Sequence, residues 1–260
     1  MKINSKHRVL SIILSVLMVL SLMPVAVFAD STKGTKDSPY TREEFSTMTR
    51  TEYIAAQEEL GGIMYVDVGN YSYETTGTLG NGTTDNSDKD STKLNYYAAN
   101  GYRDERNDGA NDKTVVFIGK SITSGVTGYA SIDNIGTSLV LAVPDYTNVR
   151  FEGITFNNVF SFAYQLYTSP WSQLSNLTFD NCTFNGIIVG GLASNALEFN
   201  KCTFNNYTNT IYANNSNPTW IRPAYGNWTK GDNEVQGEDF KSLTSIKFTD
   251  NTVTSTRPVK

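Results

Sequence analysis

The sequence has one histidine, two cysteines, and no apolar run beyond residue 22 that is long enough to cross a bilayer. The histidine is His7, which lies in an N-terminal leader, so the rest of the chain has no imidazole for general-base catalysis or metal binding. Two cysteines are too few to staple a small disulfide-rich domain. Only 18% of the 260 residues are charged, and the chain must therefore fold around an apolar core.

The first 29 residues have the pattern of a secretory signal peptide. Three basic residues precede an apolar run over residues 9–22, and the small-residue sequence Ala26–Ala29 follows. The apolar run is shorter than the roughly 20 residues of a spanning helix. We expect cleavage after Ala29, a secreted or cell-surface location, and no membrane span in the mature chain.

The remaining 231 residues carry 18 basic and 26 acidic side chains, a net charge of −8. This balance disfavours nucleic acids and anionic membranes as partners. Residues 30–40 are polar and contain glycine and proline, so we expect a flexible linker there. Residues 41–260 are expected to form one β domain with a capping helix, with continuation beyond residue 260 as an alternative.

Two capping-box patterns predict the helical start of this domain. Thr41 pairs with Glu44, and Thr49 pairs with Glu52. The second box opens a short helix that ends at the glycines 61–62. One face of that helix is largely apolar and consists of Tyr53, Ile54, Gln57 and Leu60.

From residue 63 the period changes to that of a β-strand. Met64, Val66 and Val68 alternate with other side chains before a turn. Short apolar strands are also expected at residues 115–118 and 139–143.

Residues 74–113, rich in Gly, Asn, Asp and Thr, are expected to form a surface excursion. The alternative is a calcium loop at Asp85, Asp88 and Asp90, because clustered carboxylates suit a hard cation. This loop lacks the glycine and glutamate of an EF-hand. The expectation is no cofactor and no metal, with calcium as the alternative.

Four segments in the second half of the chain align without gaps, as in a repeat protein. Their first and third positions are apolar, so these side chains point inward from a strand. A second strand follows after two intervening residues. The segments are Val149–Asn158, Leu177–Gly186, Leu197–Asn206 and Ile246–Ser255, and their third position is Phe151, Phe179, Phe199 and Phe248.

Matching residue types also recur at matching positions between and after these strands. The corner favours types that tolerate positive φ, and the second strand has an outward threonine column closed by asparagine. Coils stacked about 4.8 Å apart place like residues on like, which a hairpin array does not require. We therefore predict an all-β parallel β-helix, or solenoid. The columns are Gly153, Asn181, Lys201, Asp250; Thr155, Thr183, Thr203, Thr252; and Asn157, Asn185, Asn205, Thr254.

The outward positions of the repeat predict no carboxylate cluster. The first strand presents Arg150, Thr178, Glu198 and Lys247, and the second presents threonine throughout. Ice binding would need a flat two-column array beside the threonines. The sequence does not indicate one, and the β-propensity of threonine accounts for the column.

Cys182 and Cys202 share one inward column of adjacent repeats, near enough for a disulfide. Two buried free thiols are the preferred interpretation, because parallel strands in register orient both side chains the same way. Asn251 follows in this column and is expected to be a stacked or capping amide.

The spacing of the repeats is irregular. The third-position phenylalanine recurs after 28, 20 and 49 residues, and the last interval fits two coils or one coil with a long loop. Residues 115–255 are expected to make roughly six coils. No capping helix follows the last repeat, and we expect either oligomerisation at this end or a longer chain, because an uncapped coil exposes strand edges.

With its N-terminal helix and the segments GGIMYVDVGNYSY (61–73), TVVFIGKS (114–121) and NVRFEGITFNN (148–158), the sequence resembles the pectate-lyase-like superfamily. The likeness covers about residues 49–255. It implies a right-handed parallel β-helix, a fold that hosts lyases, hydrolases, esterases, tailspikes and adhesins. The calcium site of the lyases and the paired acids of the hydrolases are not recognisable, so no catalytic residue is carried over.

One aromatic loop is the candidate carbohydrate-binding site. Trp220, Tyr225 and Trp228 lie within nine residues, punctuated by proline and glycine. Flat rings with polar tips suit stacking on sugars. The alternative is that they pack the loop onto the β-helix. A weaker second group is Tyr164, Tyr167 and Trp171.

The leading functional interpretation is a secreted or cell-surface recognition or adhesion protein that binds an extracellular glycan or a host or cell-surface component. The first alternative is a polysaccharide lyase or glycoside hydrolase, for which two carboxylates would be needed. Another is the structural stem of a larger surface protein. The candidate acids lie near the aromatic loop, and the simpler interpretation is that they are solvated loop residues. They are Asp232, Glu234, Glu238 and Asp239.

Overall fold

The computed structural model describes residues 32–74, 76–82, 90–94, 109–110, 112–125, 138–144, 146–158, 161–163, 174–185, 188–190, 194–205, 221–222 and 245–254. The chain divides into two units, Met1–Lys33 and Gly34–Lys260, and the fold below is that of the second. The expected signal peptide lies outside the described residues. Within the described ranges, no helix has the length and apolar character needed to cross a bilayer.

The second unit begins with a short strand and two helices. Strand β1 (Tyr40–Thr41) leads into α2 (Arg42–Thr47), and α3 (Arg50–Glu59) follows. Both predicted capping boxes are confirmed, because Thr41 and Thr49 accept hydrogen bonds from the backbone N–H groups of Glu44 and Glu52, whose side chains bond back. Leu60 caps the C-terminus of α3, and glycines 61 and 62 follow with positive φ.

The segment before these helices contacts the first coil, and the flexible linker expected at residues 30–40 stays a prediction. The carbonyl of Gly34 accepts a hydrogen bond of 2.7 Å from the N–H of Tyr65. Strand β1 pairs in parallel with the first strand of the β-helix, and Tyr40 packs against the apolar core. These contacts connect residues 34–41 to the first coil of the β-helix.

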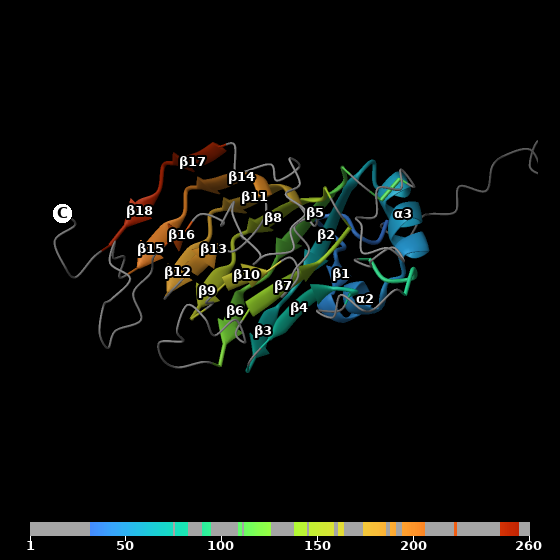
Figure 1. The fold of residues 1–260 in the computed structure, drawn as a ribbon, viewed down its shortest axis with the longest axis horizontal. Helices are drawn as coiled ribbons and strands as arrows, with labels where there is room; N and C mark the ends of the chain where they lie inside the picture. The colour runs from blue at the N-terminus through green and yellow to red at the C-terminus, as the bar shows by residue number, and fades with distance from the viewer. Residues whose placement is uncertain are drawn as a thin grey trace, which may run out of the picture. The chain divides into compact units, whose positions relative to one another are not determined.

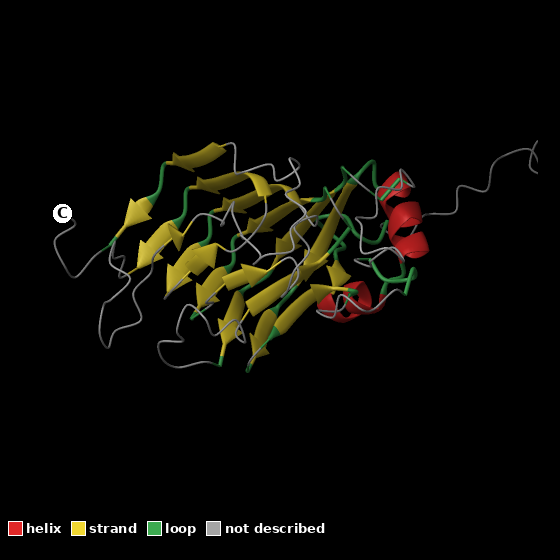
Figure 2. Ribbon diagram, in the orientation of Figure 1, coloured by secondary structure: helices red, strands yellow, loops and turns green. Residues whose placement is uncertain are grey.

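Beyond the helices, the chain coils into three parallel sheets (Figure 1, Figure 2). The seven-stranded sheet contains β1, β2 (Ile63–Asp67), β5 (Thr114–Ile118), β8 (Asn148–Glu152), β11 (Leu174–Asp180), β14 (Ser194–Asn200) and β17 (Ser245–Thr249). The six-stranded sheet contains β3 (Asn70–Tyr73), β6 (Ser121–Ser124), β9 (Thr155–Asn157), β12 (Thr183–Asn185), β15 (Thr203–Asn205) and β18 (Thr252–Val253). The five-stranded sheet contains β4 (Gly77–Gly80), β7 (Ser138–Ala142), β10 (Ser161–Ala163), β13 (Ile188–Gly190) and β16 (Ile221–Arg222).

The predicted repeat register is confirmed. Phe179 of β11 lies opposite Phe151 on one side and Phe199 on the other, and Phe199 lies opposite Phe248. The second strands stack in the same way, with Thr183 between Thr155 and Thr203. Every pairing among the described strands is parallel, so the fold is an all-β parallel β-helix with a helical N-terminal cap.

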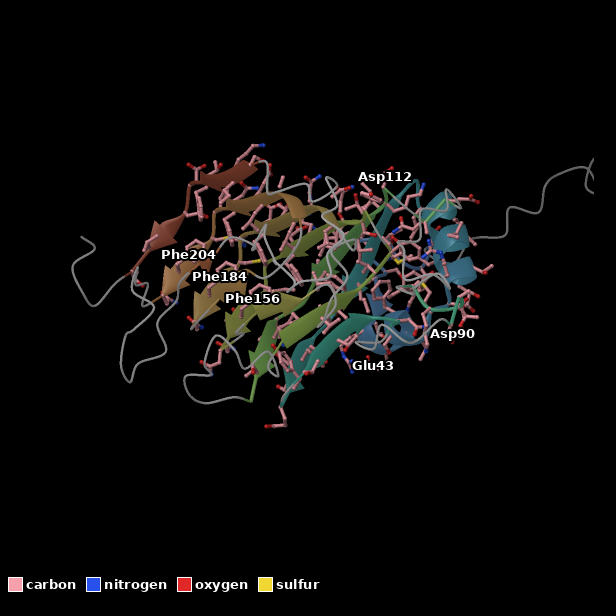
Figure 3. All side chains as sticks on the ribbon, in the orientation of Figure 1. Glu43, Asp90, Asp112, Phe156, Phe184 and Phe204 are labelled. Carbon is pink, nitrogen blue, oxygen red and sulfur yellow. The ribbon has the colours of Figure 1, made fainter. Side chains whose placement is uncertain are left out.

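Two stacks of phenylalanine form the interior of the later coils. Rings at the third repeat position stack at centroid distances of 5.0 to 5.3 Å from Phe117 to Phe248. A second stack on the six-stranded sheet contains Phe156, Phe184 and Phe204, which follow one another along successive coils in Figure 3. The stacks meet edge to face, and the core is a continuous aromatic column.

The corner between the seven- and six-stranded sheets is also as predicted. Its residues adopt the left-handed conformation, with φ of 72° at Gly153, 52° at Asn181 and Lys201, and 54° at Asp250. All four positions are exposed, so side chains there project into solvent, and asparagine and aspartate are among the non-glycine residues found most often at positive φ.

The number of coils differs slightly from the sequence-based prediction. Residues 114–254 make five coils rather than six, and Ile63–Gly80 make one more. Strand β14 pairs directly with β17, so the long last interval is one coil with a long connection. The excursion over residues 74–113 contains strand β4, and its Leu94 and Ala110 are buried.

The last coil leaves part of its apolar column uncovered. Ile246 is 39% exposed, Phe248 53% and Val253 51%, although the equivalent side chains of earlier coils are buried. Oligomerisation at this end stays a prediction.

Candidate functional site

Two outer faces of the β-helix, those of the seven-stranded and six-stranded sheets, are candidate binding surfaces. We call the outer face of the seven-stranded sheet the charged face. Its outward side chains include Arg150, Glu152, Asp180, Glu198 and Lys247. We call the outer face of the six-stranded sheet the hydroxyl–amide face. Its two outward columns are Asn70, Ser121, Thr155, Thr183, Thr203, Thr252 and Ser72, Thr123, Asn157, Asn185, Asn205, Thr254.

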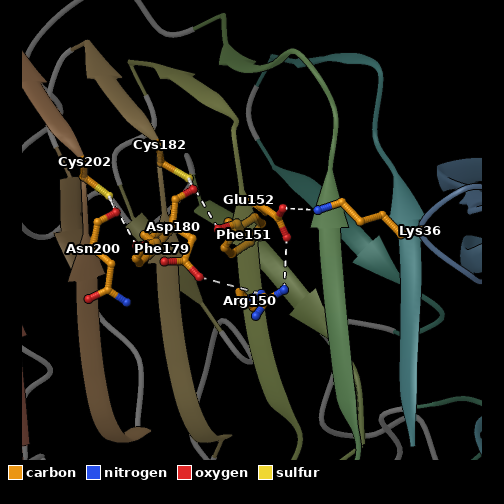
Figure 4. A network of polar contacts seen from close by, with 9 residues as sticks. All are labelled: Lys36, Arg150, Phe151, Glu152, Phe179, Asp180, Cys182, Asn200 and Cys202. Atoms are coloured by element: carbon orange, nitrogen blue, oxygen red, sulfur yellow. Dashed lines mark hydrogen bonds and ion pairs between the residues drawn. The ribbon is translucent and has the colours of Figure 1, made fainter. Parts of the chain in front are cut away.

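The charged face brings together two carboxylates that the sequence does not predict to lie close together. Glu152 and Asp180 are register partners on adjacent strands, because each stands one residue before the corner. Arg150 donates a 3.0 Å hydrogen bond to Glu152 and lies 3.9 Å from Asp180 (Figure 4). The prediction of no carboxylate cluster considered only the middle outward column and is therefore wrong for this edge of the sheet.

This carboxylate pair is neutralised by basic side chains. Lys36, from the segment before β1, reaches Glu152 at 2.5 Å. The hydrogen bond from Lys36 holds the pKa of the Glu152 carboxyl below its usual range, and the pKa of Lys36 is raised by the same contact. A glycosidase general acid needs a raised carboxyl pKa. Glu152 is therefore held as an ion-pair partner and is a poor proton donor.

The two cysteines are buried free thiols, as preferred from the sequence. Cys182 donates to the carbonyl of Phe151 at 3.5 Å, and Cys202 donates to that of Phe179 at 3.3 Å (Figure 4). Asn251 continues this column by donating to Phe199 and accepting from the N–H of Cys202, so its predicted role as a capping amide is confirmed.

We expect both thiols to be unreactive in the folded protein. Both thiols are 1% exposed, which keeps reagents away from the sulfur atoms, and burial also raises the pKa of the Cys182 thiol. Native protein should react with a thiol reagent far more slowly than protein in denaturant, where both thiols should be titrated. A non-reduced chain with the mass of the disulfide form would contradict this expectation.

The hydroxyl–amide face is a regular two-column surface. All twelve side chains are at least partly accessible to solvent. The chain as a whole is 18% charged, so about two charges would be expected among them, yet none is present. The sequence does not indicate a flat two-column array, but in the structure the asparagine column of the repeats lies in register beside the threonine column on this face.

A ladder of side-chain hydrogen bonds fixes the second column. Asn157 donates to Thr123 at 3.1 Å, Asn185 to Asn157 at 3.0 Å, and Asn205 to Asn185 at 2.7 Å. Thr254 then donates to Asn205 at 3.0 Å. This ladder orients the amide groups before any ligand arrives.

The residues chosen from the sequence as candidate sites lie mostly outside the described residues. This holds for Trp220, Tyr225 and Trp228, for Tyr164, Tyr167 and Trp171, and for the four acids at 232–239. Of the calcium candidates only Asp90 is described, and its carboxylate accepts hydrogen bonds from the backbone and hydroxyl of Thr92. Within the described ranges no group of three potential metal ligands is present.

Comparison with protein-family models, curated proteins and solved structures finds no match for this chain.

Proposed function

We propose that this chain is an extracellular, non-catalytic recognition protein that binds a glycan on the hydroxyl–amide face. The observation that carries the proposal is the set of twelve accessible hydroxyl and amide positions without a charge. Hydroxyl and amide groups both donate and accept hydrogen bonds, and sugars present the same two functions. The leader pattern and the likeness to the pectate-lyase-like superfamily support an exported carbohydrate-recognising β-helix as part of this proposal.

A binding role fits the described chemistry better than an enzymatic one. Acid–base cleavage of a glycoside needs one carboxyl with a raised pKa, whereas Glu152 is ion-paired and has a lowered pKa. The aromatic loop with Trp220, Tyr225 and Trp228 stays a predicted additional contact.

Thr183→Lys is expected to weaken glycan binding by at least about tenfold, because it places a hydrated cation at the centre of an uncharged face. The chain lacking residues 1–29 would be screened on a glycan array, and the affinity of each hit measured by calorimetry. Thr178→Lys is the matched control, since Thr178 is also an outward threonine of the same coil but lies on the charged face. We expect Thr178→Lys to leave the affinity within about twofold.

Two results would count against this function. Release of new reducing ends from a bound polysaccharide would make the chain an enzyme. Absence of binding to any glycan by the folded chain would remove the recognition role itself.

A further inference from the structure

We propose that the ligand is an extended, uncharged polysaccharide lying along the axis of the β-helix, with about one sugar unit over each coil of the hydroxyl–amide face. This inference rests on the proposed function and adds the ligand's class, its orientation and its length. It concerns the face formed by β3, β6, β9, β12, β15 and β18, and its central positions are Thr155, Asn157, Thr183, Asn185 and Thr203.

The repeat distance of the face gives the orientation. Successive parallel strands lie about 4.8 Å apart, and the two outward positions of one strand lie about 6.7 Å apart. In an extended chain of linked pyranose rings, the advance per ring is similar to the spacing between neighbouring strands. A ligand along the axis therefore meets an uncharged pair of polar side chains at each ring, and this pair is threonine with asparagine on β9, β12 and β15. A ligand across the strands meets only one or two pairs.

The amide ladder supports the same orientation. Within the ladder, the side-chain amides of Asn157 and Asn185 each donate one N–H and accept one hydrogen bond at the amide oxygen. A primary amide has two N–H groups and two oxygen lone pairs, so each amide keeps one donor and one acceptor. The remaining hydrogen-bonding capacity of these two amides repeats from coil to coil. Because the ladder fixes the amides, binding loses little side-chain entropy.

The absence of charge on the face and the negative net charge of the chain favour an uncharged polysaccharide as the ligand. The face has no cation to pair with a uronate, and the mature chain has a net charge of −8 that repels polyanions. No aromatic side chain lies among the twelve positions, so the affinity that this face contributes comes from many weak polar contacts. Such binding depends strongly on ligand length.

The test uses the chain lacking residues 1–29 with graded β-1,4-linked oligomers of glucose and of N-acetylglucosamine, and with oligogalacturonate as the acidic comparator. We expect affinity to rise with each added unit up to about six units, since six strands form the face, and then to level off. Affinity for the neutral series should change little with salt. Oligogalacturonate should bind at least about tenfold more weakly.

Three variants locate the ligand. Asn185→Asp should weaken binding of the longest oligomer by at least about tenfold, because it adds a charge and breaks the ladder. Asn176→Asp is its matched control, since Asn176 makes an equivalent 2.7 Å amide contact with Asn148 on the charged face. Thr252→Lys, on the last strand, should shorten the length at which affinity levels off. The melting temperature of each variant shows that it is folded.

The outcomes separate this inference from the broader function. Binding that is independent of oligomer length, that prefers oligogalacturonate, or that responds to Asn176→Asp instead of Asn185→Asp overturns the inference and leaves glycan recognition standing. Absence of binding to any glycan overturns both. Inhibition of ice recrystallisation that Thr183→Lys abolishes would assign the face to a crystalline water surface and also overturn both.

Discussion

Replacement of Phe179 by alanine is expected to lower the free energy of unfolding by about 3–5 kcal/mol. Phe179 is 1% exposed, and its ring stacks on Phe151 at 5.3 Å and on Phe199 at 5.0 Å. It also meets Phe156 and Phe184 edge to face. Its removal leaves a cavity in the middle of both stacks, and neighbouring coils cannot close this gap without breaking the strand register. Urea denaturation followed by circular dichroism measures the change.

Phe248→Ala is the control for this prediction. Phe248 occupies the same column and stacks on Phe199 at 5.1 Å, but it is 53% exposed at the open end. Only one face of its ring is packed, so we expect Phe248→Ala to lower the free energy of unfolding by less than half as much as Phe179→Ala. Equal losses at the two positions would contradict the stacked-column model of stability, and a larger loss at Phe248 would show that the open end is covered in solution.

The sequence predicts the stacked coils well because their geometry requires matching residues. Phe151, Phe179, Phe199 and Phe248 align in the printed sequence and lie in one column of the structure. The corner was recognisable for the same reason. A residue such as Asn181 with φ of 52° needs a side chain that tolerates this conformation.

Most of the five-stranded sheet could not be recognised in this way, although its strand β7 corresponds to the strand expected at residues 139–143. Its strands β10 and β13 have three residues each, too few to show an alternating pattern. The contacts of residues 34–41 could not be predicted either, because the hydrogen bond between Gly34 and Tyr65 joins positions far apart in sequence.

The candidate site was visible in part. Both columns of the hydroxyl–amide face were present in the aligned repeats, but the positions that β3 and β6 add lie outside those repeats, so only the coordinates show that the columns extend over six strands. The pair of Glu152 and Asp180 was overlooked because each residue stands next to the corner, where sequence alone does not fix the direction of a side chain.

Gly80→Ala is expected to destabilise the fold by about 3–5 kcal/mol, even though it adds a single methyl group. Gly80 has φ of 104°, a conformation in which alanine is strained. It ends β4 opposite Ala142 of β7. A methyl group there would overlap the carbonyl oxygen of Ala142 and lie 2.8 Å from its carbonyl carbon. Backbone atoms in a parallel ladder cannot move aside without loss of the pairing that joins the first two coils.

Gly153→Asn separates this steric effect from the general cost of replacing a glycine with positive φ. Gly153 has φ of 72°, and a Cβ at this position meets no atom within 4 Å. The next coil already carries asparagine at the equivalent corner, Asn181, with φ of 52°. We therefore expect a change of about 1 kcal/mol or less at Gly153, measured by the same urea denaturation. A loss at Gly153 as large as that at Gly80 would mean that positive φ itself limits stability. Near-wild-type stability of Gly80→Ala would mean instead that β4 and β7 are not held together by the pairing described above.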